Sequence, residues 1–228
     1  MSDTEIDNIP IKDLYIVRHG QTEWNVAQRM QGRMDSPLTE RGRAQAQANG
    51  ALLQRAGGVE QLWVSPSGRT AETANLINSH VRAHIEYADA LMERDCGLWS
   101  GLTLTQIEQD YPDAWAARNK NAYEHRPPEG ENLHDMLLRV KDFLDDLFVV
   151  DWGSVGLVTH GVMSKVILKY FLGLSELQCV GLRHPNELVY RLQFFADRIE
   201  PSYYLDGGES QDGLLYTDSQ LHQYPVQK

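Results

Sequence analysis

The sequence predicts an α/β fold built around a mainly parallel sheet, and three short apolar runs carry this prediction. The runs are LYIVRH from Leu14, QLWVSP from Gln61 and SVGLVTH from Ser154. Each run is rich in Val, Ile, Leu or aromatic residues, and each is followed by a helical pattern, as in βαβ units. With 228 residues, of which 42% are hydrophobic, the chain is long enough for one substantial core. We therefore expect one domain over residues 1–228, with its core at about 13–200.

The first long helix is predicted to begin after Thr39, whose hydroxyl can cap it, and to stop at Gly57 and Gly58. This helix would turn four residues toward the core: Ala44, Ala48, Ala51 and Leu52.

A second, clearer helix is predicted to begin after Asn132. Its apolar positions follow the three-and-four spacing of an amphipathic helix, and they are Leu133, Met136, Leu137, Val140, Leu144 and Leu147. The run NELVYRLQFF, from Asn186, then alternates in the manner of a strand.

Residues 1 to about 11 and from about 205 onward have the composition of arms with little core of their own. Residues 102–130 are the least regular segment and are predicted to form a lid or binding loop.

Charge and composition narrow the classes of partner. The formal net charge of −11 argues against a surface that grips nucleic acid or an anionic membrane. No run approaches the roughly 20 apolar residues of a membrane span, and the N-terminus lacks the pattern of a signal peptide, so a cytoplasmic protein is expected. Cys96 and Cys179 do not suggest a disulfide framework. A homodimer stays open.

Basic and imidazole side chains follow the predicted strands at the points where they end. Arg18, His19 and Gly20 follow the first strand, a turn with Arg69 follows the second, and His160 and Gly161 follow the third. Ligands of parallel α/β sheets collect beyond the carboxyl ends of the strands. Two arginines and two histidines at a helix N-terminus suit a phosphoryl group, because guanidinium groups and helix N–H groups pair with phosphate oxygens.

Other chemistries fit these residues less well. A zinc site is disfavoured, because His19 and His160 lack helical pairing, neither cysteine lies in a close ligand pair, and arginines beside the site would repel a cation. The sequence holds no G-x-x-x-x-G-K-[ST] loop, no Cys-x5-Arg arrangement and no Asp-x-Asp pair. Histidine is therefore left as the candidate nucleophile. We expect Arg18 and Arg69 to lower the pKa of His19, which keeps its lone pair available near neutral pH.

The run VRHGQTEWN resembles the signature of the histidine phosphatase superfamily, the phosphoglycerate-mutase-like proteins. The runs SPSGRTAETA, LMERDCGLWSGLT, PPEGEN, VTHG and HPNELV follow in the order of that family, over residues 13 to 194. The resemblance implies a three-layer α/β/α sandwich with a small helical lid over about 102–130, no metal and no other cofactor. It also implies a small-molecule phosphate ester as the partner.

The resemblance assigns roles to single residues. His19 would be the nucleophile, and Arg18, Arg69 and His160 would hold the phosphate oxygens. Glu93 would give a proton to the leaving oxygen and then activate water. Substrate contacts would come from four further residues: Gly20, Thr22, Asn25 and Gly161.

Departures from the family pattern keep alternatives open. Asn132 stands where the family often has serine, and both residues can cap a helix. Glu187 follows the HPN run, where it either alters the pocket or faces solvent, and we expect that its side chain faces solvent.

A phosphatase is favoured over a cofactor-dependent phosphoglycerate mutase, because Thr22 stands where mutases usually carry serine and the insertion is short. A mutase would need a basic patch, for which the insertion offers Arg118, Lys120, His125 and Arg126. A phospho-ligand binding protein without turnover is the third possibility.

Overall fold

The computed structural model describes residues 12–147, 149 and 152–217. Its strands form one seven-stranded sheet in the order β3-β2-β4-β1-β5-β6-β7. The strands are β1 (Lys12–Arg18), β2 (Gln61–Val64), β3 (His84–Tyr87), β4 (Ser154–Thr159), β5 (Leu188–Phe194), β6 (Ile199–Leu205) and β7 (Ser210–Asp212). The helices are α2 (Glu23–Val26), α3 (Glu40–Arg55), α4 (Gly68–Val81), α5 (Leu104–Asp110), α6 (Pro112–Lys120), α7 (Leu133–Asp146), α8 (Gly161–Leu172) and α9 (Glu176–Gly181). Short 3₁₀ turns cover Asp89–Leu91 and Gly97–Trp99.

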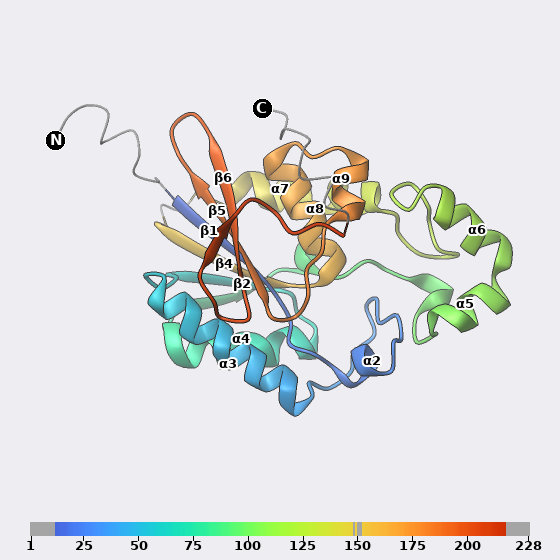
Figure 1. Ribbon diagram of the computed structural model, residues 1–228, viewed down its shortest axis with the longest axis horizontal. Helices are drawn as coiled ribbons and strands as arrows, with labels where there is room; N and C mark the ends of the chain where they lie inside the picture. Colours follow the sequence, from blue (N-terminus) through green and yellow to red (C-terminus); the bar gives the residue numbers. More distant parts are fainter. Residues whose placement is uncertain (1–11, 148, 150–151, 218–228) are drawn as a thin grey trace.

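The predicted α/β sandwich with a central sheet is confirmed. β1, β2, β3 and β4 run parallel to one another, whereas β5 pairs antiparallel with β1, and β6 and β7 continue the antiparallel pairing along that edge. The three strands predicted from apolar runs are therefore β1, β2 and β4, which lie side by side at the centre of the sheet. Their carboxyl ends, and the residues that follow them, meet at one edge of the sheet (Figure 1).

Alternating residues of β1 supply both layers of the core. Leu14 and Ile16 belong to the cluster formed with α7 and α8, while Tyr15 and Val17 belong to the cluster formed with α3 and α4. This period-two alternation is what a strand covered on both faces requires. Figure 1 shows α3 and α4 on one side of the sheet and α7 and α8 on the other.

The helix after Asn132 is confirmed as α7, with Asn132 as its N-cap and a capping box to Asp135. The predicted core face of α3 is wrong at Ala44 and Ala48, whereas the burial of Leu52 and the cap at Thr39 are confirmed. Ala44 and Ala48 are exposed. The buried residues of α3 are instead Gly42, Gln45, Ala46, Asn49, Gly50, Leu52 and Leu53. Two glycines belong to this face because backbones come close there: Gly42 lies against the turn after β1, and Gly50 lies against Ile77 of α4.

The prediction that the chain beyond about 205 has little core is also wrong for the described part. Leu214 and Tyr216 are 4% and 8% exposed and pack in the cluster with α7 and α8. The strand β6 was not expected either, and it pairs along the whole length of β5. The predicted N-terminal arm, residues 1–11, and the end of the chain, residues 218–228, lie outside the described residues.

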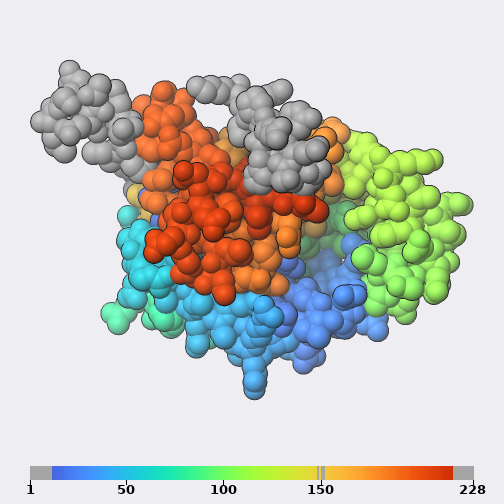
Figure 2. Space-filling model, in the orientation of Figure 1, coloured from blue at the N-terminus to red at the C-terminus, as the bar shows by residue number. Residues whose placement is uncertain are grey.

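Residues 102–130 contain α5 and α6, which project from the body at one side (Figure 1). They have a small core of their own around Cys96, Trp99 and Ile107, with Trp115 packed against it. Figure 2 shows these helices as a separate green lobe beside the blue segment that follows β1. The lid thus faces the carboxyl edge of the sheet.

Close packing of two glycines joins α3 to the turn after β1. A Cβ atom on Gly42 would lie 2.1 Å from the carbonyl oxygen of Gln21, and one on Gly20 would lie 2.2 Å from that of Gly42. No side-chain rotation can relieve a clash between a Cβ and a backbone atom. We expect Gly42→Ala to lower the free energy of unfolding by about 3 kcal/mol, measured by urea denaturation. Gln47→Ala, at an exposed position of the same helix, should change it by less than about 0.5 kcal/mol.

Candidate active site

His19 is held rigidly just beyond the end of β1. Its backbone N–H donates to the carbonyl of Thr159, and its own carbonyl accepts a hydrogen bond of 2.6 Å from the side-chain amide of Asn186. The ring Nδ1 lies 2.8 Å from the carbonyl oxygen of Gly20. Because a carbonyl can only accept, Nδ1 carries the hydrogen and the lone pair lies on Nε2. The geometry therefore leaves Nε2 as the nitrogen that can attack.

The electrostatic surroundings keep this imidazole neutral. Burial lowers the pKa of His19 well below its usual value, and the charges of Arg18 and Arg69 lower it further. The expected direction of the pKa shift is confirmed. Burial is the largest cause, because His19 is only 3% exposed.

A cavity of about 170 Å³, called here the His19 cavity, lies in front of this ring. Its lining residues are Arg18, His19, Asn25, Arg29, Met30, Gln31, Gly32, Arg69, Glu93, Arg94, Cys96 and Val162. Four guanidinium groups and one carboxylate therefore face the same space. The buried Nε atoms of Arg18, Arg69 and Arg94 have no hydrogen-bond partner among the described residues. Unpaired buried donors on cationic groups are costly, and an anion in the cavity would satisfy them.

Arg69 is fixed by carbonyls of the loop before α3. It donates from Nη1 to Met34 and from Nη2 to Gly32, at 2.7 and 2.8 Å, and pairs with Asp35 at 3.0 Å. Only 2% of Arg69 is exposed. Its guanidinium group is therefore positioned before any ligand arrives.

His160 lies behind this arginine, with its ring centroid 5.4 Å from that of His19. The Arg69 Nη2 donates to Nδ1 of His160 at 3.0 Å, so Nδ1 is the acceptor nitrogen. Nε2 then donates to the hydroxyl of Ser65 at 2.7 Å. Both ring nitrogens are thus engaged, and contact between His160 and a phosphate oxygen stays a prediction.

Glu93 belongs to the loop after β3, and its carboxylate lies against the N-terminus of α8. Its Oε1 accepts from the N–H groups of Arg94 and Met163 at 2.8 and 3.2 Å, and its Oε2 accepts from Val162 at 3.1 Å. The first turn of a helix favours a negative charge, and here it orients the carboxylate at the wall of the His19 cavity. A carboxyl group in this place can reach the oxygen of a bound phosphate ester.

The loop that carries Glu93 is held by an ion pair between Arg139 of α7 and Glu131, which precedes that helix. Arg139 donates to the carbonyls of Ala90 and Met92 at 2.9 and 3.0 Å and pairs with Glu131 at 3.0 Å. Glu131 also accepts from the N–H of Asp95 at 2.9 Å. The pair therefore fixes the backbone on both sides of Glu93.

The predicted substrate-contact residues are distributed unevenly. Asn25 lines the His19 cavity, and Gly161 lines a second cavity beside it. A Cβ on Gly161 would lie 3.3 Å from Nε of Arg18, so this glycine gives the guanidinium room. Among the described residues that line the His19 cavity, neither Gly20 nor Thr22 occurs. The Gly20 N–H donates to the hydroxyl of Thr73, and Thr22 caps α2.

Several residues of the site were not found from the sequence. Arg29 and Arg94 line the His19 cavity, Ser65 and Asn186 position the two imidazoles, and Arg139 positions Glu93. Asn186 lies in the HPN run and Ser65 directly follows β2, so both lie in segments that the sequence analysis identifies. The contacts of Arg139 depend on how α7 packs, for which the sequence carries no local signal.

Glu187 does not line the His19 cavity, and its side chain is not fully exposed to solvent. It is half-buried, and it accepts a hydrogen bond of 3.0 Å from the side chain of Gln45. Gln45 in turn accepts from the N–H of Gln21. The expectation that Glu187 faces solvent is therefore wrong, because this carboxylate ties the HPN turn to α3.

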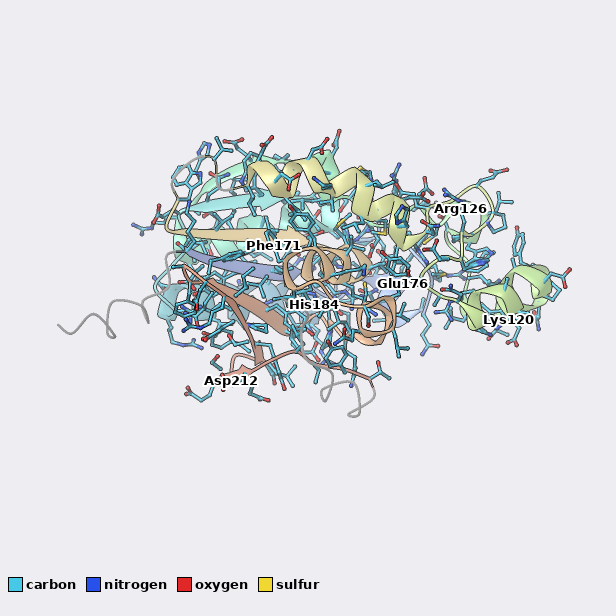
Figure 3. The ribbon with its side chains drawn as sticks, turned by 90° about the horizontal axis from the view of Figure 1, so that it is seen from above. Lys120, Arg126, Phe171, Glu176, His184 and Asp212 are labelled. Carbon is cyan, nitrogen blue, oxygen red and sulfur yellow. The ribbon has the colours of Figure 1, made fainter. Side chains whose placement is uncertain are left out.

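The cations of the lid do not form one patch. Arg126 pairs with Asp135 on α7, and Lys120 is exposed. Figure 3 shows Lys120 and Arg126 well apart within this part of the molecule. Arg118 and His125 lie close enough to Arg94 for its charge to lower the pKa of each, after the larger effect of burial. Arg118 and His125 thus lie near Arg94, which lines the His19 cavity, and of the two only Arg118 is a cation near neutral pH.

Buried neutral histidines make the fold sensitive to acid. Burial lowers the pKa of His184 to about 3 and the pKa values of His19 and His160 well below the usual value. Below about pH 6.5 these histidines bind protons in the unfolded chain but stay neutral in the folded chain. The free energy of unfolding is therefore undiminished above that pH and decreases as the pH falls toward the folded pKa. Each histidine contributes a slope of ~1.4 kcal/mol per pH unit.

We expect His184→Gln to reduce the slope of unfolding free energy against pH, between about pH 6.5 and 5, by the contribution of one histidine. Urea denaturation at several pH values measures this slope. The exposed His84 provides the control, and His84→Gln should leave the slope as it is. An unchanged slope for His184→Gln would contradict the assignment of His184 as a buried neutral group.

Within residues 12–147, 149 and 152–217, no three His, Cys, Asp or Glu side chains are grouped so that they could hold a metal ion. In the same part of the chain, no helix has both the length and the apolarity needed to cross a membrane.

Comparison with known sequences identifies relatives of two kinds. The chain is 32% identical over 183 residues to the probable phosphoglycerate mutase GpmB of Enterobacter sp. (strain 638), a match that covers 79% of this chain and 84% of the relative. It is 34% identical over 175 residues to the 6-phosphofructo-2-kinase/fructose-2,6-bisphosphatase of Caenorhabditis elegans. That match covers 75% of this chain, which spans only 37% of the length of the longer relative.

Solved structures agree in fold and family. The mycobacterial glucosyl-3-phosphoglycerate phosphatase in complex with VO3 superposes with a TM-score of 0.74 at 27% identity, covering 87% of this chain and 100% of the other. YhfR of Bacillus stearothermophilus superposes with a TM-score of 0.70 at 29% identity, covering 92% and 99%. The family model of the histidine phosphatase superfamily (branch 1) matches residues 14–206, which is most of the chain. The protein therefore belongs to the histidine phosphatase superfamily, branch 1.

Proposed function

We propose that this protein is a metal-independent phosphatase that hydrolyses a small phosphate monoester through a phosphohistidine intermediate. The single observation that carries the proposal is the arrangement around the His19 cavity. There a neutral imidazole whose Nδ1 carries the hydrogen, the guanidinium-bearing residues Arg18 and Arg69, and Glu93 line one space.

The reaction proceeds in two steps. In the first, Nε2 of His19 attacks phosphorus, the bond from phosphorus to the ester oxygen breaks, and Glu93 gives its proton to the leaving oxygen. In the second, water attacks phosphorus, the N–P bond breaks, and Glu93 takes a proton from the water. The carboxyl group thus returns to its starting form. Arg18 and Arg69 neutralise the equatorial oxygens, where the charge of the transition state lies.

The preorganisation of the site supports this chemistry. Arg69 is held by loop carbonyls, His19 by Asn186, and Glu93 by the start of α8. Phosphoryl transfer needs little covalent chemistry beyond the nucleophile, and positioning with charge stabilisation supplies most of the acceleration. Each cation is in place without rearrangement.

The test is release of inorganic phosphate from p-nitrophenyl phosphate and from a panel of phosphorylated metabolites, with and without EDTA. Hydrolysis that EDTA does not reduce supports the proposal.

Exchange between 2- and 3-phosphoglycerate, stimulated by the bisphosphorylated acid, would identify a mutase instead. Arg94, Arg118 and His125 near the mouth are the feature that favours this second candidate. Binding of phosphate esters without turnover of any of them would indicate a binding protein.

A further inference from the structure

A second cavity begins where the His19 cavity ends. It has a volume of about 480 Å³ and is called here the Lys165 cavity. Its lining residues are Arg18, Glu93, Gly161, Val162, Lys165, Leu182, Arg183, His184, Pro185 and Thr217. Arg18, Glu93 and Val162 also line the His19 cavity, so the two spaces share a wall. Volumes of a few hundred Å³ are typical of sites for small ligands.

The position of Glu93 connects this space to the substrate. A proton donor must contact the oxygen that leaves phosphorus, so the alcohol part of the ester has to begin beside Glu93. The Lys165 cavity is the larger of the two spaces that Glu93 borders. It is therefore the place with room for the remainder of the substrate.

The lining of the Lys165 cavity is net positive, whereas the protein as a whole has a net negative charge. Three cations line it, namely Arg18, Lys165 and Arg183, and Glu93 is the one acidic residue in its described lining. His184 adds no charge near neutral pH, since burial lowers its pKa to about 3. In a chain with a net charge of −11, a basic cavity of this kind indicates an anionic ligand.

Among the described residues, no acidic side chain forms an ion pair with either of the two cations beyond Arg18. Lys165 is half-buried and donates to the carbonyl of Val180 at 3.0 Å, and burial lowers its pKa. Arg183 is exposed at the rim, and its guanidinium group has no hydrogen-bond or ion-pair partner among the described residues. A partly desolvated ammonium group gains most from an anion that comes within hydrogen-bond distance.

We propose that the Lys165 cavity binds a second anionic group of the substrate, a phosphate or a carboxylate, through Lys165 and Arg183. The proposal rests on the proposed function, because it assigns this cavity to the alcohol part of the same ester. Lys165 lies four residues beyond Gly161 on α8, a rise of about 6 Å along the helix.

The test uses three esters with the same three-carbon chain. They are propyl phosphate, which has no second anion, 3-phosphooxypropanoate, which adds a carboxylate, and propane-1,3-diol bisphosphate, which adds a phosphate. We expect kcat/KM for at least one anionic ester to exceed that for propyl phosphate by about 10- to 100-fold, as expected for a hydrogen-bonded charge pair. The preferred ester identifies the second group as carboxylate or phosphate.

The variants Lys165→Gln and Arg183→Gln should each reduce this preference by about 10-fold. Lys169→Gln is the matched control. Lys169 lies one turn further along α8 and also donates to a backbone carbonyl, that of Leu174, but it is absent from the described lining of the cavity. The control should keep the preference of the wild type. Equal kcat/KM for all three esters, or a preference that survives both substitutions, overturns the proposal.

A binding measurement separates this proposal from the proposed function. The variant His19→Ala cannot form the phosphoenzyme, so calorimetric titration with the same three esters reports affinity alone. Tighter binding of an anionic ester that is lost in His19→Ala/Lys165→Gln supports the subsite, even if the wild type hydrolyses none of the esters. Hydrolysis of all three esters with equal affinities leaves the proposed function standing and rejects the subsite.

Discussion

Replacing His19 by alanine is expected to lower kcat/KM for phosphate esters by on the order of 10⁴-fold or more, because the variant lacks the atom that attacks phosphorus. The loss should be similar for good and poor leaving groups, since no substrate can use the first step. The cavity should still bind phosphate, because its arginines remain. Phosphate release measures the loss, and calorimetric titration with inorganic phosphate measures the retained binding.

Capture of the intermediate locates the nucleophile directly. Wild-type protein mixed with substrate and quenched under conditions that preserve phosphoramidates should gain the mass of one phosphoryl group on the peptide that contains His19. His84→Ala, at an exposed site on β3, is the control and should retain full turnover and labelling. Labelling at any other residue would redirect the mechanism, and full activity in His19→Ala would reject it.

The strand ends explain why so much of the site was predictable. Arg18 and His19, Arg69, and His160 each follow an apolar run, and the runs are adjacent strands of the sheet. Parallel order then places the ends of these strands at one edge. The local pattern thus determined where these four side chains would meet.

Packing that depends on contacts distant in the sequence was not predictable in this way. The inner face of α3 was misassigned because Gly42 contacts the backbone of Gln21, and a close approach of two backbones leaves no hydrophobic periodicity. Leu214 and Tyr216 were missed because glycine, serine and acidic residues surround them. Their segment is held by contacts distant in the sequence, such as the bridge between Leu182 and Tyr216 and the hydrogen bond from the N–H of Arg183 to the carbonyl of Leu215.

The same distinction applies within the site. Residue type identified His19 as a nucleophile, but its tautomer follows from the carbonyl of Gly20 and its neutrality mainly from burial. The tautomer could not be read from the sequence, which predicted the neutral ring from the charges of Arg18 and Arg69 and not from burial. Arg139, which holds the backbone around Glu93, acts from a helix whose amphipathic pattern indicated only packing.

Substitution of Glu93 tests the mechanism most directly, because its role as proton donor depends on the leaving group of the substrate and its role as base does not. We expect Glu93→Gln to lower kcat/KM for an alkyl phosphate by about 10²- to 10⁴-fold, the usual contribution of a general acid. For p-nitrophenyl phosphate, whose leaving group needs no proton, kcat/KM should fall far less, since this ratio reports the first step. A plot of kcat/KM against leaving-group pKa should therefore become steeper in the variant.

The second step gives the matching expectation. Esters whose first step stays fast, such as p-nitrophenyl phosphate, form the same phosphoenzyme, so for them loss of the base should lower kcat to one common value limited by attack of water, with phosphoenzyme accumulating. Glutamine cannot accept every N–H bond that the carboxylate receives from Arg94, Val162 and Met163, so thermal unfolding and phosphate affinity must be measured alongside. Equal slowing of aryl and alkyl esters, with unchanged phosphate affinity, would remove Glu93 from the role of proton donor.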